Sequence, residues 1–221
     1  MSKGLFITLE GGEGSGKTSV MLFVKEFLES RGLQVKTTRE PGGIPIAEQI
    51  RSVILDVENT EMDEWTEALL YTAARRQHLV EVILPNLKKG VTVLCDRFID
   101  SSLVCQGYVR GLGVDYISVL NLFATRGLFP DLTLWMDVTP EEGLRRINAN
   151  SGREVNRLDL ESVNFHKKVQ EGYRRIQKKY PERIVRVDAD QSLEGVYKDI
   201  KIVLETFLEK ISLRDSLEGY M

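Results

Sequence analysis

Residues 11–18 form a glycine-rich phosphate-binding loop, the feature that most constrains the fold of this chain. The loop directly follows the apolar run Leu5–Leu9 and precedes a segment whose apolar residues recur at helical spacing. Glycines let successive backbone N–H groups turn toward a polyphosphate, and the next helix presents its positive end to the same anion. A lone string of this kind also recurs by chance, but its setting between strand and helix predicts nucleotide binding. The loop residues expected at the nucleotide are Gly11, Gly12, Glu13, Gly14, Ser15, Gly16, Lys17 and Thr18.

Composition narrows the function classes. The length of 221 residues suits one α/β domain spanning 1–221, and 30 Lys+Arg against 33 Asp+Glu leave no basic field for nucleic acid or a membrane surface. Only Cys95 and Cys105 occur, so neither a disulfide framework nor a cysteine metal site is indicated, and a cytoplasmic location is expected. The N-terminal apolar run is cut by Glu10, unlike a signal peptide, and no apolar run approaches the ~20 residues of a membrane span.

Strand-like and helical segments alternate along the chain, which predicts a parallel sheet with helices on both faces. Helices are expected over Ile46–Leu55, Met62–Lys89, Tyr116–Arg126, Glu161–Lys179 and a final segment from Leu193. Pro85 should end or kink the second of these helices. The expected strands are Gly4–Leu9, Gln34–Thr38, Val91–Cys95, Leu132–Val138 and Ile184–Val187.

The polar, turn-prone segment 148–158 breaks this alternation and contains Arg153 and Arg157. It is either a plain connection with solvating arginines or a lid that brings guanidinium groups to a transferring phosphoryl. The residues alone leave both interpretations open.

Polar residues follow two of the predicted strands. Asp96 and Arg97 end the third strand, and the carboxyl ends of parallel strands form the ligand edge of such sheets. Asp96 is suited to hydrated Mg²⁺, as is the hydroxyl of Thr18, and Arg97 offers a planar fork for a phosphate on a second substrate. Arg39 follows the second strand and should reach the same edge. The alternative for Asp96 and Arg97, a surface ion pair, is less favoured after a buried strand.

Tyr71 and Arg75 are four residues apart on a predicted helix and share one face. They could stack on and hydrogen-bond a nucleobase. Taken alone, the pair is better explained by a core aromatic residue and a solvated Arg75–Arg76 pair. GTPases recognise guanine with an Asn-Lys-x-Asp string. This string does not occur in the chain, which disfavours a GTPase switch.

Several of these motifs together resemble one family. The chain is similar to bacterial thymidylate kinases over essentially its whole length. The matching segments, in the family's order, are residues 9–18 (LEGGEGSGKT), 38–43 (TREPGG), 96–102 (DRFIDSS), 106–108 (QGY) and 156–159 (NRLD).

The resemblance implies a P-loop nucleoside monophosphate kinase fold, with a five-stranded parallel sheet flanked by helices and a short lid. It implies transfer of the γ-phosphoryl of Mg·ATP to dTMP, giving ADP and dTDP for dTTP synthesis, with ATP and Mg²⁺ as cofactors. A homodimer built from helices beside the base site is also implied. In-line transfer depends on alignment and charge neutralisation, so the residues assigned to catalysis are Glu13, Lys17, Arg97 and Arg153.

Residue by residue, the resemblance assigns Arg39 and Arg97 to the dTMP phosphate and places Glu13 near the 3′-hydroxyl. The catalytic arginine of the bacterial type lies in the lid, where Arg153 is expected at the phosphoryl and Arg157 at ATP. The phosphate-binding loop itself carries Gly14 and no arginine.

At the base, Tyr71 would stack on thymine and Arg75 would donate to its O4, while Ser102 and Gln106 would contact its Watson–Crick side. Cys105 departs from the family, which places an aromatic residue there against the 2′ side of the sugar. We therefore expect Cys105 to relax the rejection of ribonucleotides, unless a neighbour such as Tyr108 fills the space.

Two smaller departures are Phe98, where the family has Tyr, and Tyr71, where it has Phe; neither should abolish function. A deoxynucleoside kinase is the alternative enzyme, but Arg39 would then have no acceptor phosphate to bind. A non-catalytic nucleotide-binding regulator is a further alternative, which the lid arginines disfavour. His78 and His166 are expected at the surface or in helix packing, because phosphoryl transfer of this kind needs no histidine.

Overall fold

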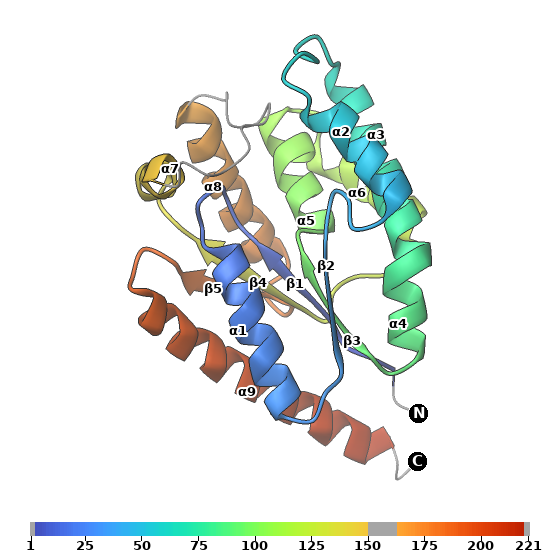
Figure 1. Ribbon diagram of the computed structural model, residues 1–221, viewed down its shortest axis with the longest axis vertical. Coiled ribbons are helices and arrows are strands. Elements are labelled where there is room, and N and C mark those ends of the chain that lie inside the picture. The colour runs from blue at the N-terminus through green and yellow to red at the C-terminus, as the bar shows by residue number, and fades with distance from the viewer. Residues whose placement is uncertain (1–2, 150–162, 219–221) are drawn as a thin grey trace.

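The sheet and its flanking helices place every polar strand end on one side of the molecule. Across residues 3–149 and 163–218, which the computed structural model describes, the chain forms a five-stranded parallel sheet in the spatial order β2-β3-β1-β4-β5 (Figure 1). This confirms the predicted α/β architecture. The strands are β1 Phe6–Glu10, β2 Val35–Arg39, β3 Thr92–Asp96, β4 Leu132–Asp137 and β5 Ile184–Asp188.

Helices cover both faces of the sheet (Figure 1). On one face α1 and α9 pack their apolar sides against β1, β3 and β4, with Val24 and Ile200 fully buried in this core. On the other face two further apolar clusters form around Trp135 and Phe98. The helices are α1 Lys17–Ser30, α2 Pro45–Leu55, α3 Glu64–His78, α4 Leu84–Lys88, α5 Ile99–Ser102, α6 Val114–Thr125, α7 Pro140–Ala149, α8 Val163–Lys179 and α9 Leu193–Glu218.

The carboxyl ends of β1, β2 and β3 bring polar residues to one edge of the sheet. The first three strands each extend one residue beyond the predicted end, so that Glu10, Arg39 and Asp96 belong to them. Asp96 is the register partner of both Leu9 on β1 and Arg39 on β2. The three polar residues therefore reach one edge of the sheet, as predicted for Arg39 and Asp96.

The helix predicted over Met62–Lys89 continues through Pro85 instead of ending there. A π-helical turn, η1 Leu79–Ile83, precedes the proline, and the N–H of Leu84 donates to the carbonyl of Leu79. A wider turn before the proline relieves the clash that its ring would make with the preceding turn of an α-helix. Neither this turn nor a second π-helical segment, η2 Leu103–Val109, was predicted from the sequence.

Helix α7 was not predicted either, and it includes residues 148 and 149 at the start of the proposed lid. The rest of that segment, residues 150–158 with Arg153 and Arg157, lies outside the described residues. Within the described part of the chain, no helix has the length and apolar character needed to cross a membrane.

Candidate active site

The phosphate-binding loop joins β1 to α1 and wraps around the side chain of Lys17. Lys17 Nζ donates to the carbonyls of Gly11 and Gly12 at 3.1 and 2.9 Å. Burial, followed by the nearby Arg97, lowers the pKa of Lys17. Gly14 has a φ of 71°, and a Cβ there would lie 2.2 Å from the carbonyl oxygen of Gly143 on α7. Glycine at this position is thus required by backbone conformation and by close packing.

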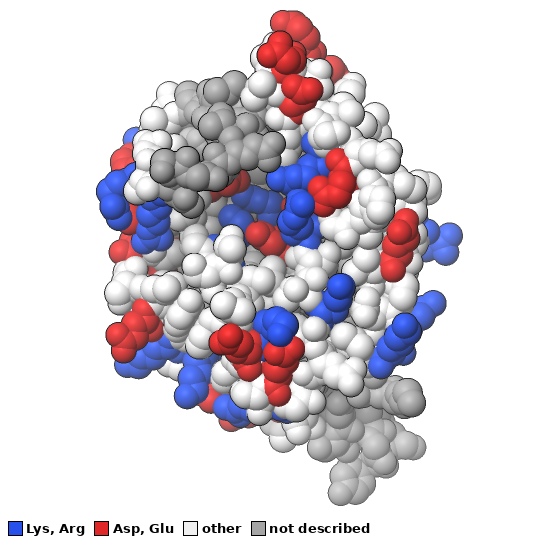
Figure 2. Space-filling model, viewed as in Figure 1, with Lys and Arg blue, Asp and Glu red and all other residues white. Residues whose placement is uncertain are grey.

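A cavity of about 1050 Å³ opens beside this loop. Its walls come from the loop, the ends of β2 and β3, helices α2 and α3, segment η2 and the start of α8. Figure 2 shows Lys and Arg side chains gathered in the hollow on this face, with acidic side chains beside them. The cavity brings together Glu13, Lys17, Thr18, Arg39, Tyr71, Arg75, Asp96, Arg97, Ser102, Cys105 and Gln106, all predicted from the sequence, with the loop residues Gly12, Gly14, Ser15 and Gly16.

Asp96 and Thr18 both line this cavity. Asp96 Oδ1 is buried and has no hydrogen-bond partner among the described residues. A buried carboxylate oxygen without a donor needs a cation or an ordered water. The carboxylate and the hydroxyl thus fit a hydrated Mg²⁺, which keeps several waters and takes few protein ligands.

Arg39 and Arg51 converge on the loop that follows β2. Arg39 NH1 and Arg51 NH1 donate to the carbonyl of Pro41 at 3.2 and 3.1 Å, and both residues line the cavity. Burial and the proximity of Arg39 lower the pKa of Arg51. Glu48 accepts from Arg39 NH2 and offsets part of this positive charge. Two neighbouring guanidinium groups at a cavity wall have the chemistry to bind an anion.

Arg97 lies between the phosphate-binding loop and α5. Its guanidinium donates to the carbonyl of Gly11 at 3.0 Å, to Ser101 Oγ at 3.3 Å and to Glu13 Oε1 at 2.5 Å. The alternative of an Asp96–Arg97 surface ion pair is wrong, because Arg97 pairs with Glu13 and is only 19% exposed. Arg97 thus bridges the two regions expected to hold donor and acceptor phosphates.

Arg75 is fully buried at the inner end of the cavity, which contradicts the alternative of a solvated Arg75–Arg76 pair. Its Nε donates to Glu40 Oε2 at 2.7 Å, and its NH1 donates to Ser102 Oγ at 3.0 Å and to Asn121 Oδ1 at 2.5 Å. Arg76 NH1 donates to the carbonyl of Ala124. Buried pairing of this kind fixes the Arg75 fork in one plane, as recognition of a planar base requires.

Gln106 and Cys105 belong to η2 on the cavity wall. Gln106 Nε2 donates to the buried Glu67 at 2.9 Å, which orients the amide. Burial raises the pKa of the Cys105 thiol to about 12, so it is a neutral, inert side chain near neutral pH. Tyr108 does not line the cavity; its ring lies 4.8 Å from the Arg175 guanidinium carbon on α8. Tyr108 therefore does not fill the space beside Cys105.

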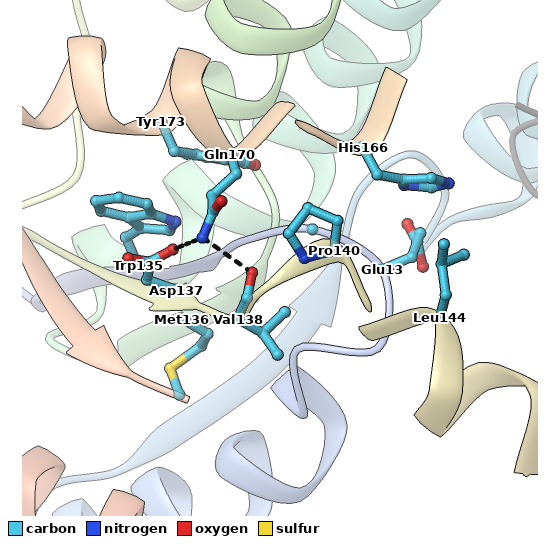
Figure 3. A pocket seen from close by; sticks show the side chains of 11 residues that line it. Glu13, Trp135, Met136, Asp137, Val138, Pro140, Leu144, His166, Gln170 and Tyr173 are labelled. Carbon is cyan, nitrogen blue, oxygen red and sulfur yellow. Dashed lines mark hydrogen bonds between the residues drawn. The ribbon is translucent and has the colours of Figure 1, made fainter. Parts of the chain in front are cut away.

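A second pocket, of only about 20 Å³, lies on the β4 side of the phosphate-binding loop (Figure 3). Gln170 donates there to Asp137 at 2.8 Å, and His166 lies close to Glu13 and Leu144 (Figure 3). The pocket is too small for a nucleotide.

His78 is fully buried and contacts Glu40 and Thr38, so it is a packing residue and not a surface one.

Several charged residues of the site were missed from the sequence, among them Arg51, Glu40 and Glu10. Arg51 lies in the middle of α2, and in the sequence it looks like an ordinary solvent-exposed arginine of a helix. Glu40 and Glu10 follow or end strands, a position that marked Asp96 as a candidate and could have marked them too. Both are buried, at 4% and 0% exposure, and hold other site residues by hydrogen bonds.

Comparisons with known proteins agree with this geometry. A family model described as thymidylate kinase matches residues 9–200. A thymidylate kinase of Halalkalibacterium halodurans is 61% identical over 199 residues, which cover 90% of this chain and 95% of that protein. Thymidylate kinases of Clostridium novyi and Bacillus velezensis are 55% and 56% identical, over 91% and 95% of this chain and 98% and 99% of their own lengths.

Proposed function

The chain belongs to the thymidylate kinase family, and we infer from this membership that it transfers the γ-phosphoryl of ATP to dTMP, giving ADP and dTDP. The observation that carries the inference is one cavity lined by both a phosphate-binding loop and a separate set of arginines. A nucleoside kinase would not need that second anion site, because its acceptor carries no phosphate. A binding protein would need no acceptor site.

The reaction is a direct transfer. An oxygen of the dTMP phosphate attacks the γ-phosphorus of ATP, and the bond from that phosphorus to the β–γ bridging oxygen breaks, leaving ADP. No covalent intermediate on the protein is needed. The contribution of the chain is alignment of the two nucleotides and neutralisation of charge on the transferred group.

On the donor side, we propose that the loop from Gly11 to Gly16 binds the ATP phosphates through its backbone N–H groups. Lys17 would leave the loop carbonyls and reach the outer phosphates. Thr18 and Asp96 would hold Mg²⁺, which neutralises phosphate charge when bound. The unpartnered Asp96 Oδ1 supports this assignment.

On the acceptor side, we assign Arg39, Arg51 and Arg97 to the phosphate of dTMP. The support is their position on one cavity and the convergence of Arg39 and Arg51 on Pro41. Phosphate would compete with Glu13 for Arg97, and the released Glu13 carboxylate would then accept from the 3′-hydroxyl of the sugar.

We assign the inner end of the cavity to the base. Tyr71 would stack on thymine, and Arg75, oriented by Glu40, would donate to O4. Ser102 and Gln106 would contact the Watson–Crick side. Cytosine has an amino group in place of O4. That amino group would place a hydrogen-bond donor against the Arg75 donors, so neither the amino group nor the guanidinium would find an acceptor.

The lid assignments continue to rest on the resemblance alone. We propose that Arg153 acts at the transferring phosphoryl and Arg157 at ATP, with 1–221 forming one kinase domain and 148–158 the lid. Neither arginine lies among the described residues.

We also propose a homodimer through α3 and α6. These adjacent helices expose large apolar side chains, and the rings of Trp65 and Tyr116 lie 6.5 Å apart across them. Phe123 is 85% exposed, an unfavourable state for a phenylalanine unless a partner covers it. The two free cysteines are compatible with the cytoplasm, where we place the protein.

The first test is ADP release from Mg·ATP with dTMP, dUMP, ribo-TMP, dCMP, dGMP and thymidine as acceptors. We expect turnover with dTMP to exceed that with dCMP and thymidine by orders of magnitude. Thymidine as the best acceptor would instead support a nucleoside kinase. Absence of turnover with every acceptor would support a binding protein.

A further inference from the structure

The backbone of Arg97 adopts a conformation that non-glycine residues rarely take. Its φ is 66°, in the left-handed region. Both peptide groups that flank Arg97 are anchored to β1. The N–H of Arg97 donates to the carbonyl of Leu9 at 2.8 Å, and the N–H of Phe98 donates to Glu10 Oε1, also at 2.8 Å.

Glu10 is fully buried at the end of β1 and accepts hydrogen bonds at both carboxylate oxygens. Oε1 accepts from the backbone N–H groups of Phe98 and Ser101, the latter at 3.3 Å. Oε2 accepts from Ser101 Oγ at 2.5 Å and from the hydroxyl of Tyr173 on α8 at 2.8 Å. All four donors are neutral, and Glu10 forms no direct ion pair with any residue that the structure describes. Three of these four donors belong to the segment that directly follows Arg97.

The Ser101 hydroxyl links this carboxylate to the Arg97 side chain. Ser101 Oγ donates to Glu10 Oε2 and accepts from Arg97 NH1 at 3.3 Å. The Glu10 carboxylate therefore restrains Arg97 twice, through the next peptide group and through its guanidinium.

We propose that Glu10 is a positioning residue that, with Ser101, fixes the direction in which Arg97 faces the acceptor phosphate. The inference rests on the proposed function, in which Arg97 binds the phosphate of dTMP. Glu10 itself does not line the cavity, whereas Arg97 and Ser101 do, so the effect of Glu10 on the substrate is indirect.

Asp100 offers a matched control on the neighbouring helix α5. It is as deeply buried as Glu10, but its partners are Arg183, at 2.6 and 2.7 Å, and Thr133 Oγ1, at 3.2 Å. Asp100→Asn removes a buried negative charge, and Thr133→Val removes a buried hydroxyl. Neither residue has a hydrogen bond to Arg97 among the described contacts.

The experiment measures the Kd for dTMP by calorimetry in Glu10→Ala, Glu10→Gln and Ser101→Ala. Each substitution is made in the wild-type chain and in an Arg97→Ala background. We expect Glu10→Ala and Ser101→Ala to weaken dTMP binding by about 10-fold in the wild-type chain, the scale of a hydrogen bond to a charged group. In the Arg97→Ala background the same changes should raise the Kd for dTMP by less than about 3-fold, because no guanidinium remains to be positioned.

Glu10→Gln should recover part of the affinity, because its oxygen can still accept from Phe98 and Ser101. Asp100→Asn and Thr133→Val should lower the Tm without a background-dependent change in the Kd for dTMP. An unchanged Kd for Mg·ATP shows that a variant is folded. If Glu10→Ala does not fold, Ser101→Ala and Glu10→Gln carry the same test.

Equal losses in both backgrounds, or a lower Tm with unchanged dTMP affinity, would overturn the proposal. A wild-type chain that does not bind dTMP would instead contradict the proposed function. The two failures are thereby distinguished.

Discussion

The guanidinium of Arg75 and the carboxylate of Glu40 form a buried ion pair, with Nε 2.7 Å from Oε2 and both side chains 2% exposed. Glu40 directly follows Arg39, so one short segment after β2 serves both ends of the proposed dTMP site. Arg39 faces the phosphate end, and Glu40 orients the arginine at the base end. The spacing between these two ends is thus set by covalent geometry as well as by packing.

Replacing Glu40 with Gln should lower stability and weaken dTMP binding together. Loss of one partner from a buried ion pair costs about 3–5 kcal/mol of unfolding free energy. The matched control is Glu29→Gln, which breaks the exposed Lys25–Glu29 pair and should cost less than about 1 kcal/mol. Urea unfolding of both variants provides the measurement. Equal small losses would show that the buried pair has no special role.

Arg51→Ala should raise the Kd for dTMP by about 10-fold or more, because it removes a charge-assisted contact to phosphate. The Kd for thymidine should not change, since thymidine has no phosphate. The control is Arg31→Ala, whose side chain pairs with Glu205 on the surface. Calorimetry with dTMP and thymidine distinguishes a loss of phosphate binding from a general loss of binding. A parallel loss for dTMP and thymidine would argue against the phosphate assignment.

The stability contribution of Glu10 should depend on pH. Burial and the neighbouring Asp100 raise the pKa of Glu10 from 4.5 to about 7. The folded state therefore holds the Glu10 proton more tightly than the unfolded state, and its stability falls as pH rises from about 4.5 to 7. Relative to Glu10→Gln, the wild type should lose up to about 3 kcal/mol across this window. Chemical unfolding of both proteins between pH 5 and about 8 tests this; a pH-independent difference would contradict it.

Cys105→Tyr should sharpen the rejection of ribo-TMP while largely preserving turnover of dTMP. The cysteine lines the cavity, and the Tyr108 ring packs on Arg175 instead, so the wild-type chain leaves space beside Cys105, where we place the sugar. The measurement is kcat/KM for dTMP relative to ribo-TMP in both proteins. If the wild type and the variant reject ribo-TMP equally, Cys105 does not relax sugar selection.

Phe123→Asp should dissociate the proposed dimer, because it places a charge at the centre of an apolar contact. Leu22→Asp on α1 is the matched control, since Leu22 is 59% exposed on the opposite face of the sheet. Sedimentation velocity at several concentrations reports the result. A wild-type chain that remains monomeric at the highest concentration would refute the dimer, and dissociation by both variants would refute the choice of α3 and α6.

Local chemistry in the sequence predicted the parts of this protein that are contiguous. The loop from Gly11 to Thr18, the five strands and the long helices each carry their signal within a few residues. Arg39, Asp96 and Arg97 were also found, because strand ends in a parallel sheet meet at one edge whatever the details of packing.

Only the tertiary structure decided which buried charges support the site. Glu10, Glu40 and Arg51 were not singled out from the sequence, and their roles depend on partners 35 to 163 residues away in the chain or on a shared carbonyl across a turn. Burial turns these polar groups from solvated side chains into fixed hydrogen-bond partners, and burial is a property of the whole fold.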